Sequence, residues 1–504
     1  MARAVLKQNV LANVLGGLWT AGLSLLIIPV QVHFLGVEAY GLIAFLASLQ
    51  ILASVFDLGL SPAITRQVAM DTSSDHGRSA AVVRAVSKLY WPVGLVLGAA
   101  LFLAAPGIAA HWLNLGSIPV PTGTRAIQLG ALALAIRWPV SFYAGVIAGR
   151  QRFAPLNAVK AGAAAVTLLG GVAVILVTRS LLAYMTWLPV AALLEVAAYT
   201  VLSARVVPWL RPGAGAEQGA PIWRFATGMN AITILSMVLT QSDRLLISKL
   251  LPVAVLGYYA LAYNVVYGLT LIPSFATTAL FPAFVESHSS QGLEALRSRY
   301  LTSTQVLLYA YNLPIWLLAF FGGDLLALVT SPATAQRAAP LLALLGIGFL
   351  FNAASSLAYT VSIGTGNTRL PVVVNVAAVI LYVPALTAAV LLWGGTGAAI
   401  AWLVLNALYI PTLLRIVHRQ ILGISTLRWL ATTLLPFVLL AVVTLGGARL
   451  FQLASGWTAE PVPLIAAAAG AAVYVAAGFW LLRAPVRTEI VHSLGALPLA
   501  AQRR

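Results

Sequence analysis

The sequence predicts an all-α polytopic membrane protein. Of its 504 residues, 61% are hydrophobic and only 8% are charged, whereas a soluble domain carries about 25% charged residues. Apolar runs of near 20 residues recur along the whole chain, and each is long enough to cross about 30 Å of hydrocarbon as a helix. These features exclude a soluble multi-domain enzyme. The absence of cysteine excludes disulfides, thiolate catalysis and cysteine-based metal sites.

About fourteen transmembrane helices can be drawn in order along the chain. The first apolar run is too long for the core of a signal peptide and has no convincing cleavage site after it, so we expect it to remain as the first span. Pro139, Pro273 and other prolines inside the spans are tolerated in bundles that satisfy the freed backbone groups. The spans lie near residues 9–33, 39–60, 88–110, 126–149, 155–178, 181–204, 222–248, 255–284, 300–321, 338–363, 370–393, 396–417, 428–448 and 461–482.

The distribution of basic residues tests this assignment. The formal net charge is +17, which in a soluble protein would suggest nucleic acid as a partner. Here the drawn spans place 22 of the 29 Lys and Arg residues on one side, six on the other, and Arg137 within a span. Cytoplasmic loops of membrane proteins collect Lys and Arg. The bias therefore predicts cytoplasmic N- and C-termini and gives no reason to expect nucleic-acid binding.

The chain is expected to divide at a Pro/Gly/Ala-rich polar stretch, Arg205–Pro221, which is typical of a flexible linker. We predict an N-terminal lobe at residues 1–204 (spans 1–6), a cytoplasmic linker at 205–221 and a C-terminal lobe at 222–420 (spans 7–12). Residues 421–504 then hold two extra C-terminal spans and a cytoplasmic tail.

A short internal repeat relates the two predicted lobes. It surrounds the end of the first span and the end of the seventh, at one fixed offset without gaps. The matched pairs are Leu35/Leu251, Val37/Val253, Gly41/Gly257 and Ala44/Ala260. Six spans separate the copies, which indicates a parallel repeat about an axis along the membrane normal; a chance match of two apolar turns is the alternative. Two pseudo-symmetric six-helix lobes predict a central cavity and alternating access by rocking of the lobes.

Three sequence segments resemble a known family. The opening residues 9–45, followed by Phe56–Ala69 (FDLGLSPAITRQVA), and the second-half segment Gln241–Asn264 (QSDRLLISKLLPVAVLGYYALAYN) are similar to the polysaccharide-transport branch of the multidrug/oligosaccharidyl-lipid/polysaccharide (MOP) exporter superfamily, the Wzx-type O-antigen flippases. The resemblance implies two six-helix bundles, a V-shaped cavity, a bacterial inner membrane and flipping of an undecaprenyl-pyrophosphate-linked oligosaccharide. A polymerase and a ligase of the same pathway are further partners that it suggests.

Two differences from related branches of the superfamily favour the polysaccharide-transport branch. A lipid II flippase is expected to carry arginines in its first span, but no charge lies between Lys7 and His33. A drug or cation antiporter is expected to carry carboxylates inside the bundle, and none lies between Lys7 and Glu38. Both remain alternative functions. A membrane polymerase or glycosyltransferase is a distant alternative, because the longest predicted outer loops contain only Glu460 as an acid.

Arg137 and Glu195 are the charges predicted at mid-depth. Arg137 lies about 11 residues, or roughly 17 Å, from either end of its span, where a charge requires a wet cavity or a partner. Its guanidinium fork matches phosphate oxygens, which suits a pyrophosphate; a structural ion pair with Glu195 is the alternative. Glu195 could instead carry a coupling proton.

Further charged candidates lie near the predicted ends of spans. Arg66 is a candidate for meeting the pyrophosphate at the cytoplasmic mouth, against an ordinary positive-inside arginine. Arg244 and Lys249 are candidates at the outer side, against snorkelling to the headgroups. The carboxylates Asp57 and Asp243 join Glu195 as candidates for ion coupling.

Uncharged polar residues complete the predicted site. Asn13 and Asn230 belong to polar stripes on spans one and seven that could line a path for sugar, or serve helix packing. Tyr259 and Asn264 on span eight could contact sugar faces, or serve packing. No metal-ligand spacing or nucleotide-binding motif is present, so we expect no cofactor, no metal and no enzymatic activity.

Overall fold

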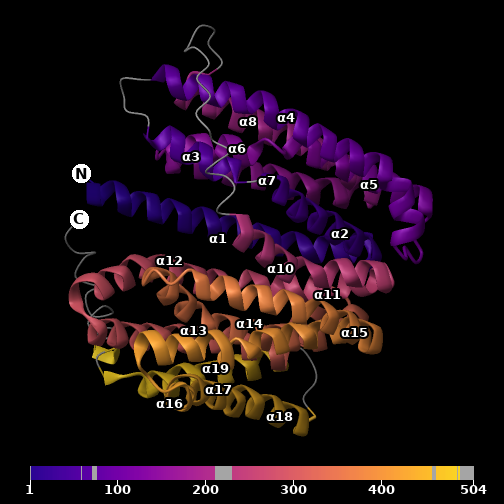
Figure 1. Ribbon diagram of the computed structural model, residues 1–504. Helices are drawn as coiled ribbons and strands as arrows, with labels where there is room; N and C mark the ends of the chain where they lie inside the picture. Colours follow the sequence, from indigo (N-terminus) through magenta and orange to yellow (C-terminus); the bar gives the residue numbers. More distant parts are fainter. Residues whose placement is uncertain are drawn as a thin grey trace, which may run out of the picture. The chain divides into compact units, whose positions relative to one another are not determined.

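The computed structural model describes residues 2–57, 59–70, 76–209, 230–456, 461–484 and 486–488, without the side chains of residues 2–15, 21, 76–78 and 230–234. Regular structure in this part of the chain is helical, apart from one isolated bridge between Asn114 and Pro252. The predicted all-α fold class is confirmed (Figure 1).

The chain forms two compact units, Met1–Ala260 and Leu261–Arg504. The helix α10, which the sequence assigns to the second lobe, clusters with the first unit. Most of the predicted linker, from residue 210 on, lies outside the described residues. The first unit holds α1 (Ala2–Leu35), α2 (Val37–Ala53), η1 (Ser54–Asp57), α3 (Leu60–Met70), α4 (His76–Gly107), η2 (Ile108–Trp112), α5 (Val120–Arg137), α6 (Val140–Gly149), α7 (Phe153–Thr178), α8 (Leu181–Val206), α10 (Asn230–Leu250) and the first half of α11 (Val253–Gly268).

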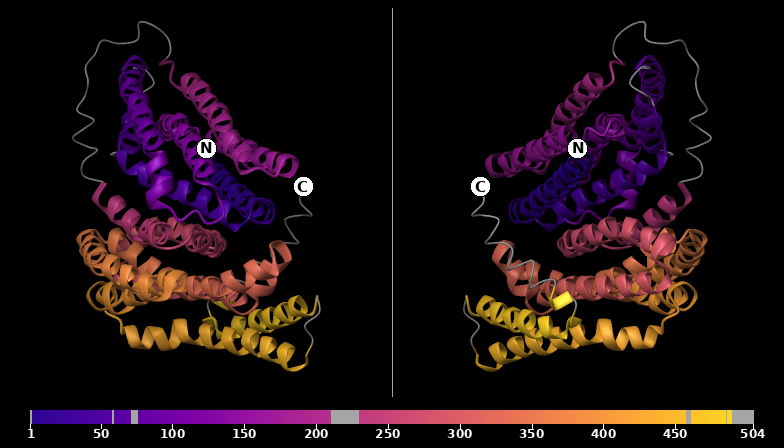
Figure 2. Two further views of the ribbon diagram at one scale, coloured as in Figure 1. Left: turned by 90° about the vertical axis from the view of Figure 1, so that its right-hand side faces the viewer. Right: turned by 90° about the vertical axis from the view of Figure 1, so that its left-hand side faces the viewer.

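The second unit continues from the middle of α11, and within each unit long helices run side by side (Figure 2). Its further helices are α12 (Leu271–Glu286), η3 (Ser287–Gln291), α13 (Leu293–Val329), α14 (Pro332–Gly364), α15 (Arg369–Leu408), η4 (Ile410–Leu414), η5 (Val417–Leu422), α16 (Thr426–Trp429), η6 (Leu430–Leu434), α17 (Leu435–Ala441), η7 (Val442–Gly446), α18 (Gly447–Ala454) and α19 (Val462–Leu481).

Twelve stretches of the described chain are long and apolar enough to cross a membrane, so the protein is polytopic as predicted. One of them, residues 369–422, folds back on itself at Gly394, whose backbone is not helical (φ 60°, ψ −139°). The Tyr409 hydroxyl donates a 3.0 Å hydrogen bond to Asn375 Oδ1, although a straight helix would separate these residues by roughly 50 Å. The stretch therefore consists of two helical segments on either side of Gly394, as predicted near 370–393 and 396–417.

Helix α10, the predicted seventh span, is not among the twelve. It contains the charged residues Asp243, Arg244 and Lys249 within its last eight residues, and charged residues lower the mean hydropathy of a helix. The count of fourteen spans is accordingly not confirmed and stays a prediction.

Small residues let the helices of the first unit pack closely. Helix α5 packs against α4 and α8, α1 against α7, and α3 against α6. A methyl group added at Gly94 would collide with the Trp138 side chain, and one added at Gly145 would lie 2.8 Å from the Ser61 carbonyl oxygen. Close backbone approach through small residues is how membrane helices gain packing contacts.

The two copies of the sequence repeat touch each other within the first unit. A Cβ added at Gly41 would collide with the Val253 carbonyl oxygen, and a Cβ added at Gly257 would collide with the Val37 carbonyl oxygen. Each glycine thus lies against the backbone of the other copy, four residues before that copy's glycine. This reciprocal contact supports a true repeat over a chance match.

In the second unit, α14 packs between α13 and α15, while α13 also contacts α19. A separate apolar core joins Phe321 to Tyr474 and to residues of α17 and η7. Arg449 of α18 pairs with Asp324 of α13 at 2.9 Å and lies over the Phe321 ring. The final helices are therefore attached to α13 by both apolar and ionic contacts.

Candidate functional site

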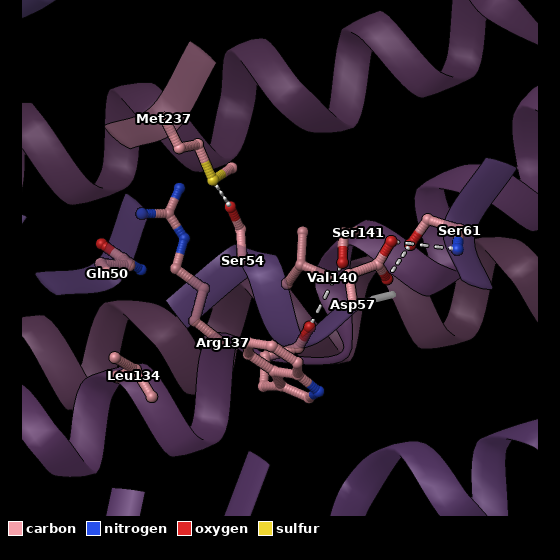
Figure 3. A pocket seen from close by; sticks show the side chains of 10 residues that line it. Gln50, Ser54, Asp57, Ser61, Leu134, Arg137, Val140, Ser141 and Met237 are labelled. Carbon is pink, nitrogen blue, oxygen red and sulfur yellow. Dashed lines mark hydrogen bonds between the residues drawn. The ribbon is translucent and has the colours of Figure 1, made fainter. Parts of the chain in front are cut away.

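A cavity of about 420 Å³ lies inside the first unit. Helices α2, η1, α3, α5, α6 and α10 contribute its walls, which combine one cation, one carboxylate and three hydroxyl groups. Figure 3 shows the Arg137 guanidinium toward the Gln50 and Met237 side and the Asp57 carboxylate beside Ser61. The lining residues are Gln50, Ser54, Asp57, Ser61, Leu134, Arg137, Trp138, Val140, Ser141 and Met237.

Arg137 owes its position to a break inside a long apolar stretch. Helix α5 ends at Arg137, and α6 begins at Val140 after Pro139. The proline ring cannot continue a regular helix without losing a backbone hydrogen bond, so carbonyl groups are freed near the break. The negative end of the α5 dipole favours a cation in its last turn. Both effects stabilise Arg137 within the stretch 120–149.

Arg137 and Glu195 form the ion pair that the sequence offered as the structural alternative. The Nε and Nη2 atoms of Arg137 lie 2.7 and 3.2 Å from the two carboxylate oxygens of Glu195 on α8. The Glu195 side chain is 8% exposed and the Arg137 side chain is 46% exposed. Because the pair uses one edge of the guanidinium, the Nη1 edge stays available to the cavity. The structural pairing is present, and it is compatible with a role for Arg137 in binding.

The Asp57 carboxylate is held in place by a hydroxyl network. It accepts hydrogen bonds from the Ser61 hydroxyl at 2.7 Å and from the Tyr90 hydroxyl. The Ser141 hydroxyl lies 3.2 Å from the Tyr90 hydroxyl. The Tyr90 ring is in turn stacked on Trp138 and Phe142. Asp57 is therefore connected to the same α5–α6 corner that carries Arg137.

Sequence reasoning missed most of the hydroxyl and amide groups of this cavity. Gln50, Ser54, Asp57 and Ser61 recur at intervals of three and four residues, which is the spacing of one helical face. This spacing is the sequence signal from which a shared polar face could have been predicted. The contribution of Tyr90 and Ser141 depends on helix packing and had no local signal.

A second polar cluster joins α10 to α11. Asp243 is fully buried and accepts hydrogen bonds from the Tyr259 hydroxyl at 2.5 Å and from the Arg244 backbone N–H at 2.7 Å. Arg244 is only 6% exposed. The Lys249 ammonium group donates to the His111 carbonyl oxygen at 2.7 Å and lies 5.3 Å from the Trp112 ring centre. The structure thus groups Asp243 and Tyr259 together, away from the cavity lining.

The remaining predicted residues are not part of the cavity lining. Arg66 is exposed on α3, and Asn264 is half-buried on α11. The side chains of Asn13 and Asn230 lie outside the described residues. Within the described chain, no group of three or more His, Asp or Glu side chains could hold a metal ion. The cavity offers anion and hydroxyl binding, through Arg137 on one side and the Asp57 network on the other.

Solved structures share this arrangement of helices. The chain aligns with a structure described as "Lipid II flippase MurJ, inward closed conformation" at a TM-score of 0.72 and 11% identity, covering 92% of this chain and 96% of that one. A structure of the MATE multidrug transporter DinF-BH aligns at 0.59 and 12% identity, covering 84% and 97%. The chain therefore has a fold like that of the MurJ and MATE structures.

Sequence comparison then identifies the family. The family model for "Polysaccharide biosynthesis protein" matches residues 6–288, more than half of the chain, and the MatE model matches residues 230–388. The chain belongs to the polysaccharide biosynthesis protein family and is a transporter of the MOP superfamily, not an enzyme. A Shigella flexneri protein described as "Putative O-antigen transporter" is 22% identical over 396 residues, covering 75% of this chain and 90% of that protein.

Proposed function

We propose that the protein flips an undecaprenyl-pyrophosphate-linked oligosaccharide, the repeat unit of O-antigen or a related polysaccharide. It moves the lipid from the cytoplasmic to the outer leaflet of the bacterial inner membrane by alternating access, and both termini are cytoplasmic. The description of the Shigella relative and the positive-inside bias of the sequence support this proposal. A polymerase and a ligase of the same pathway would act on the flipped product.

The observation that carries the proposal is the geometry of Arg137. Its guanidinium lies within an apolar stretch and is oriented by Glu195 along one edge only. A guanidinium has five N–H donors in a fixed fork, so donors remain for a second anion. A pyrophosphate presents several such oxygens and binds arginine in a bidentate manner. Arg137 thus supplies a charge-matched contact for the headgroup, and Glu195 keeps that contact in position.

The hydroxyl groups and the Asp57 carboxylate give the cavity polar hydrogen-bonding groups in addition to the Arg137 cation. Ser61 contacts the carboxylate directly, and Ser54 and Ser141 also line the cavity. Hydroxyl groups can replace hydrogen bonds to water that a hydrated headgroup loses on entering the membrane. Asp57 is a carboxylate that could couple transport to a cation gradient. In this proposal the coupling carboxylate is separate from Glu195, which is occupied by Arg137.

The test is restoration of surface polysaccharide in a strain that lacks its own O-unit flippase and makes a matching repeat unit. We expect the wild-type protein to restore the polymer and Arg137→Gln to lose at least about 90% of it at equal membrane abundance, since the charge-assisted contact is lost. Arg125→Gln, on the exposed side of the same helix α5, is the matched control and should keep full activity.

Two outcomes would contradict the proposal in different ways. Full transport by Arg137→Gln would remove the arginine from the mechanism while leaving the flippase function intact. Failure of the abundant wild-type protein to move its repeat unit in liposomes, combined with activity on lipid II or on cationic drugs, would replace the proposed substrate by one of those alternatives.

A further inference from the structure

The second unit contains an aromatic cluster with one uncovered ring. Tyr263 and Tyr267 of α11 stack at 5.6 Å between ring centres, and Phe349 of α14 packs edge-on against both, at 5.4 and 6.4 Å. Trp402 of α15 completes the cluster, 5.2 Å from Phe349. Tyr263, Phe349 and Trp402 are each 4% exposed, whereas Tyr267 is 55% exposed. Three rings therefore support a fourth that presents its other face outward.

An exposed amide follows this cluster by one helical turn. Asn352 lies three residues after Phe349 on α14, which places both on the same side of the helix, and its side chain is exposed. Its Nδ2 donates to Asn406 Oδ1 at 2.8 Å, and Asn406 Nδ2 donates to the Trp402 carbonyl oxygen at 2.8 Å. Because Asn406 is 1% exposed, it fixes the orientation of Asn352. The carbonyl oxygen of Asn352 stays available to accept a further hydrogen bond.

The position of Asn352 indicates that it does not face lipid. It lies 20 residues from the first residue of α14 and 12 from the last, roughly 30 and 18 Å along the helix. In hydrocarbon at that depth, the carbonyl oxygen of an exposed amide would lack a hydrogen-bond donor, which costs several kcal/mol. The exposed side of α14 at Asn352, one turn from the ring that packs against Tyr267, is therefore expected to meet water or a polar ligand.

We propose that Tyr267 and Asn352 form a saccharide-binding subsite, an inference that rests on the proposed function. The uncovered face of Tyr267 stacks on the C–H face of one pyranose ring, and the Asn352 amide hydrogen-bonds a hydroxyl group of that sugar. A flat aromatic ring beside a fixed amide complements a sugar, which has one apolar face and a polar rim. None of the residues of this cluster is charged, so it suits the neutral saccharide part of the substrate and not the pyrophosphate.

The experiment compares two ligands that differ only in the sugar. The full chain is purified, and its affinity is measured for undecaprenyl pyrophosphate and for the same lipid carrying the repeat unit extracted from host membranes. The variants are Tyr267→Leu, which keeps an apolar side chain without the ring, Tyr267→Trp, which keeps a ring, and Asn352→Leu. Trp393→Leu, which removes an aromatic ring that is 59% exposed elsewhere in the same unit, is the matched control.

We expect Tyr267→Leu and Asn352→Leu to weaken binding of the sugar-bearing lipid by roughly 5- to 10-fold each, with no change for undecaprenyl pyrophosphate. Tyr267→Trp should bind like the wild type, and so should Trp393→Leu. Arg137→Gln should weaken binding of both lipids equally, because both carry the pyrophosphate. This result would distinguish binding of the pyrophosphate from binding of the saccharide.

Equal binding of the sugar-bearing lipid by the wild type, Tyr267→Leu and Asn352→Leu would overturn the subsite while leaving the flippase function standing. Equal loss for both lipids in Tyr267→Leu would also overturn it, since the ring would then serve packing or lipid contact. Failure of the wild type to bind either lipid would instead contradict the proposed function itself.

Discussion

Gly41 and Gly257 lie against each other at the crossing of α2 and α11. An added Cβ at Gly41 would come within 3.0 Å of the Gly257 backbone nitrogen, and each glycine faces the carbonyl oxygen of a valine in the other helix. The two positions are equivalent in the sequence repeat. Matched residues of the two copies are therefore in direct contact, which requires glycine at both positions.

The first prediction is that Gly41→Ala destabilises the first unit. The new methyl group would overlap the Val253 backbone, which is unable to rotate away as a side chain can. We expect a cost of about 1–3 kcal/mol, measured as a lower unfolding temperature in detergent. Gly107→Ala is the control, because nothing lies within 4 Å of its added Cβ. Equal unfolding temperatures for the two variants would show that the crossing relaxes freely.

The second prediction distinguishes two roles of Arg137, which are binding of the substrate and ion pairing with Glu195. Glu195→Gln removes the carboxylate that orients the guanidinium but keeps the cation. At equal membrane abundance, we expect partial transport by Glu195→Gln and a loss of at least about 90% of transport by Arg137→Gln. The double variant, Arg137→Gln with Glu195→Gln, leaves no unpaired charge. It restores transport only if the sole role of Arg137 is to neutralise the buried Glu195 carboxylate. Recovery in the double variant would therefore exclude a substrate role for Arg137.

The third prediction concerns ion coupling at Asp57. If this carboxylate carries a coupling ion, transport by Asp57→Asn in liposomes should no longer respond to an imposed proton or sodium gradient. Tyr90→Phe removes one hydrogen bond to the carboxylate and should change the response without abolishing it. Glu286→Gln, at an exposed position, is the control for loss of a carboxylate. A gradient response that survives in Asp57→Asn would assign coupling to another group.

The fourth prediction concerns the attachment of the last helices. Arg449→Met leaves Asp324 without its ion-pair partner, and both side chains are about one quarter exposed, at 24% and 27%. We expect a loss of about 1–2 kcal/mol, between the values for exposed and buried pairs. The double variant with Asp324→Asn should recover part of it. If Arg449→Met unfolds like the wild type in thermal melts, the apolar contacts of α19 alone hold these helices.

The sequence by itself determined the fold class, the positions of most spans and the family. The fold class and the spans follow from the length and spacing of apolar runs, which are local in the chain. The family follows from the resemblance carried by residues 9–45, Phe56–Ala69 and Gln241–Asn264. Arg137 could also be singled out this way, because a charge within an apolar stretch is visible without any structure. Its pairing with Glu195 could be proposed because both residues lie near the middle of their predicted spans.

Only the tertiary structure decided which polar groups share a cavity. It brought Asp57 to Tyr90 and Ser141 across three helices, and it buried Arg244, which the sequence offered as a candidate at the outer side. It also fixed Asn352 through Asn406, 54 residues away. The physical reason is that the rotation of each membrane helix about its own axis depends on packing against its neighbours. Hydropathy, which sets where a helix begins and ends, carries little information on that rotation.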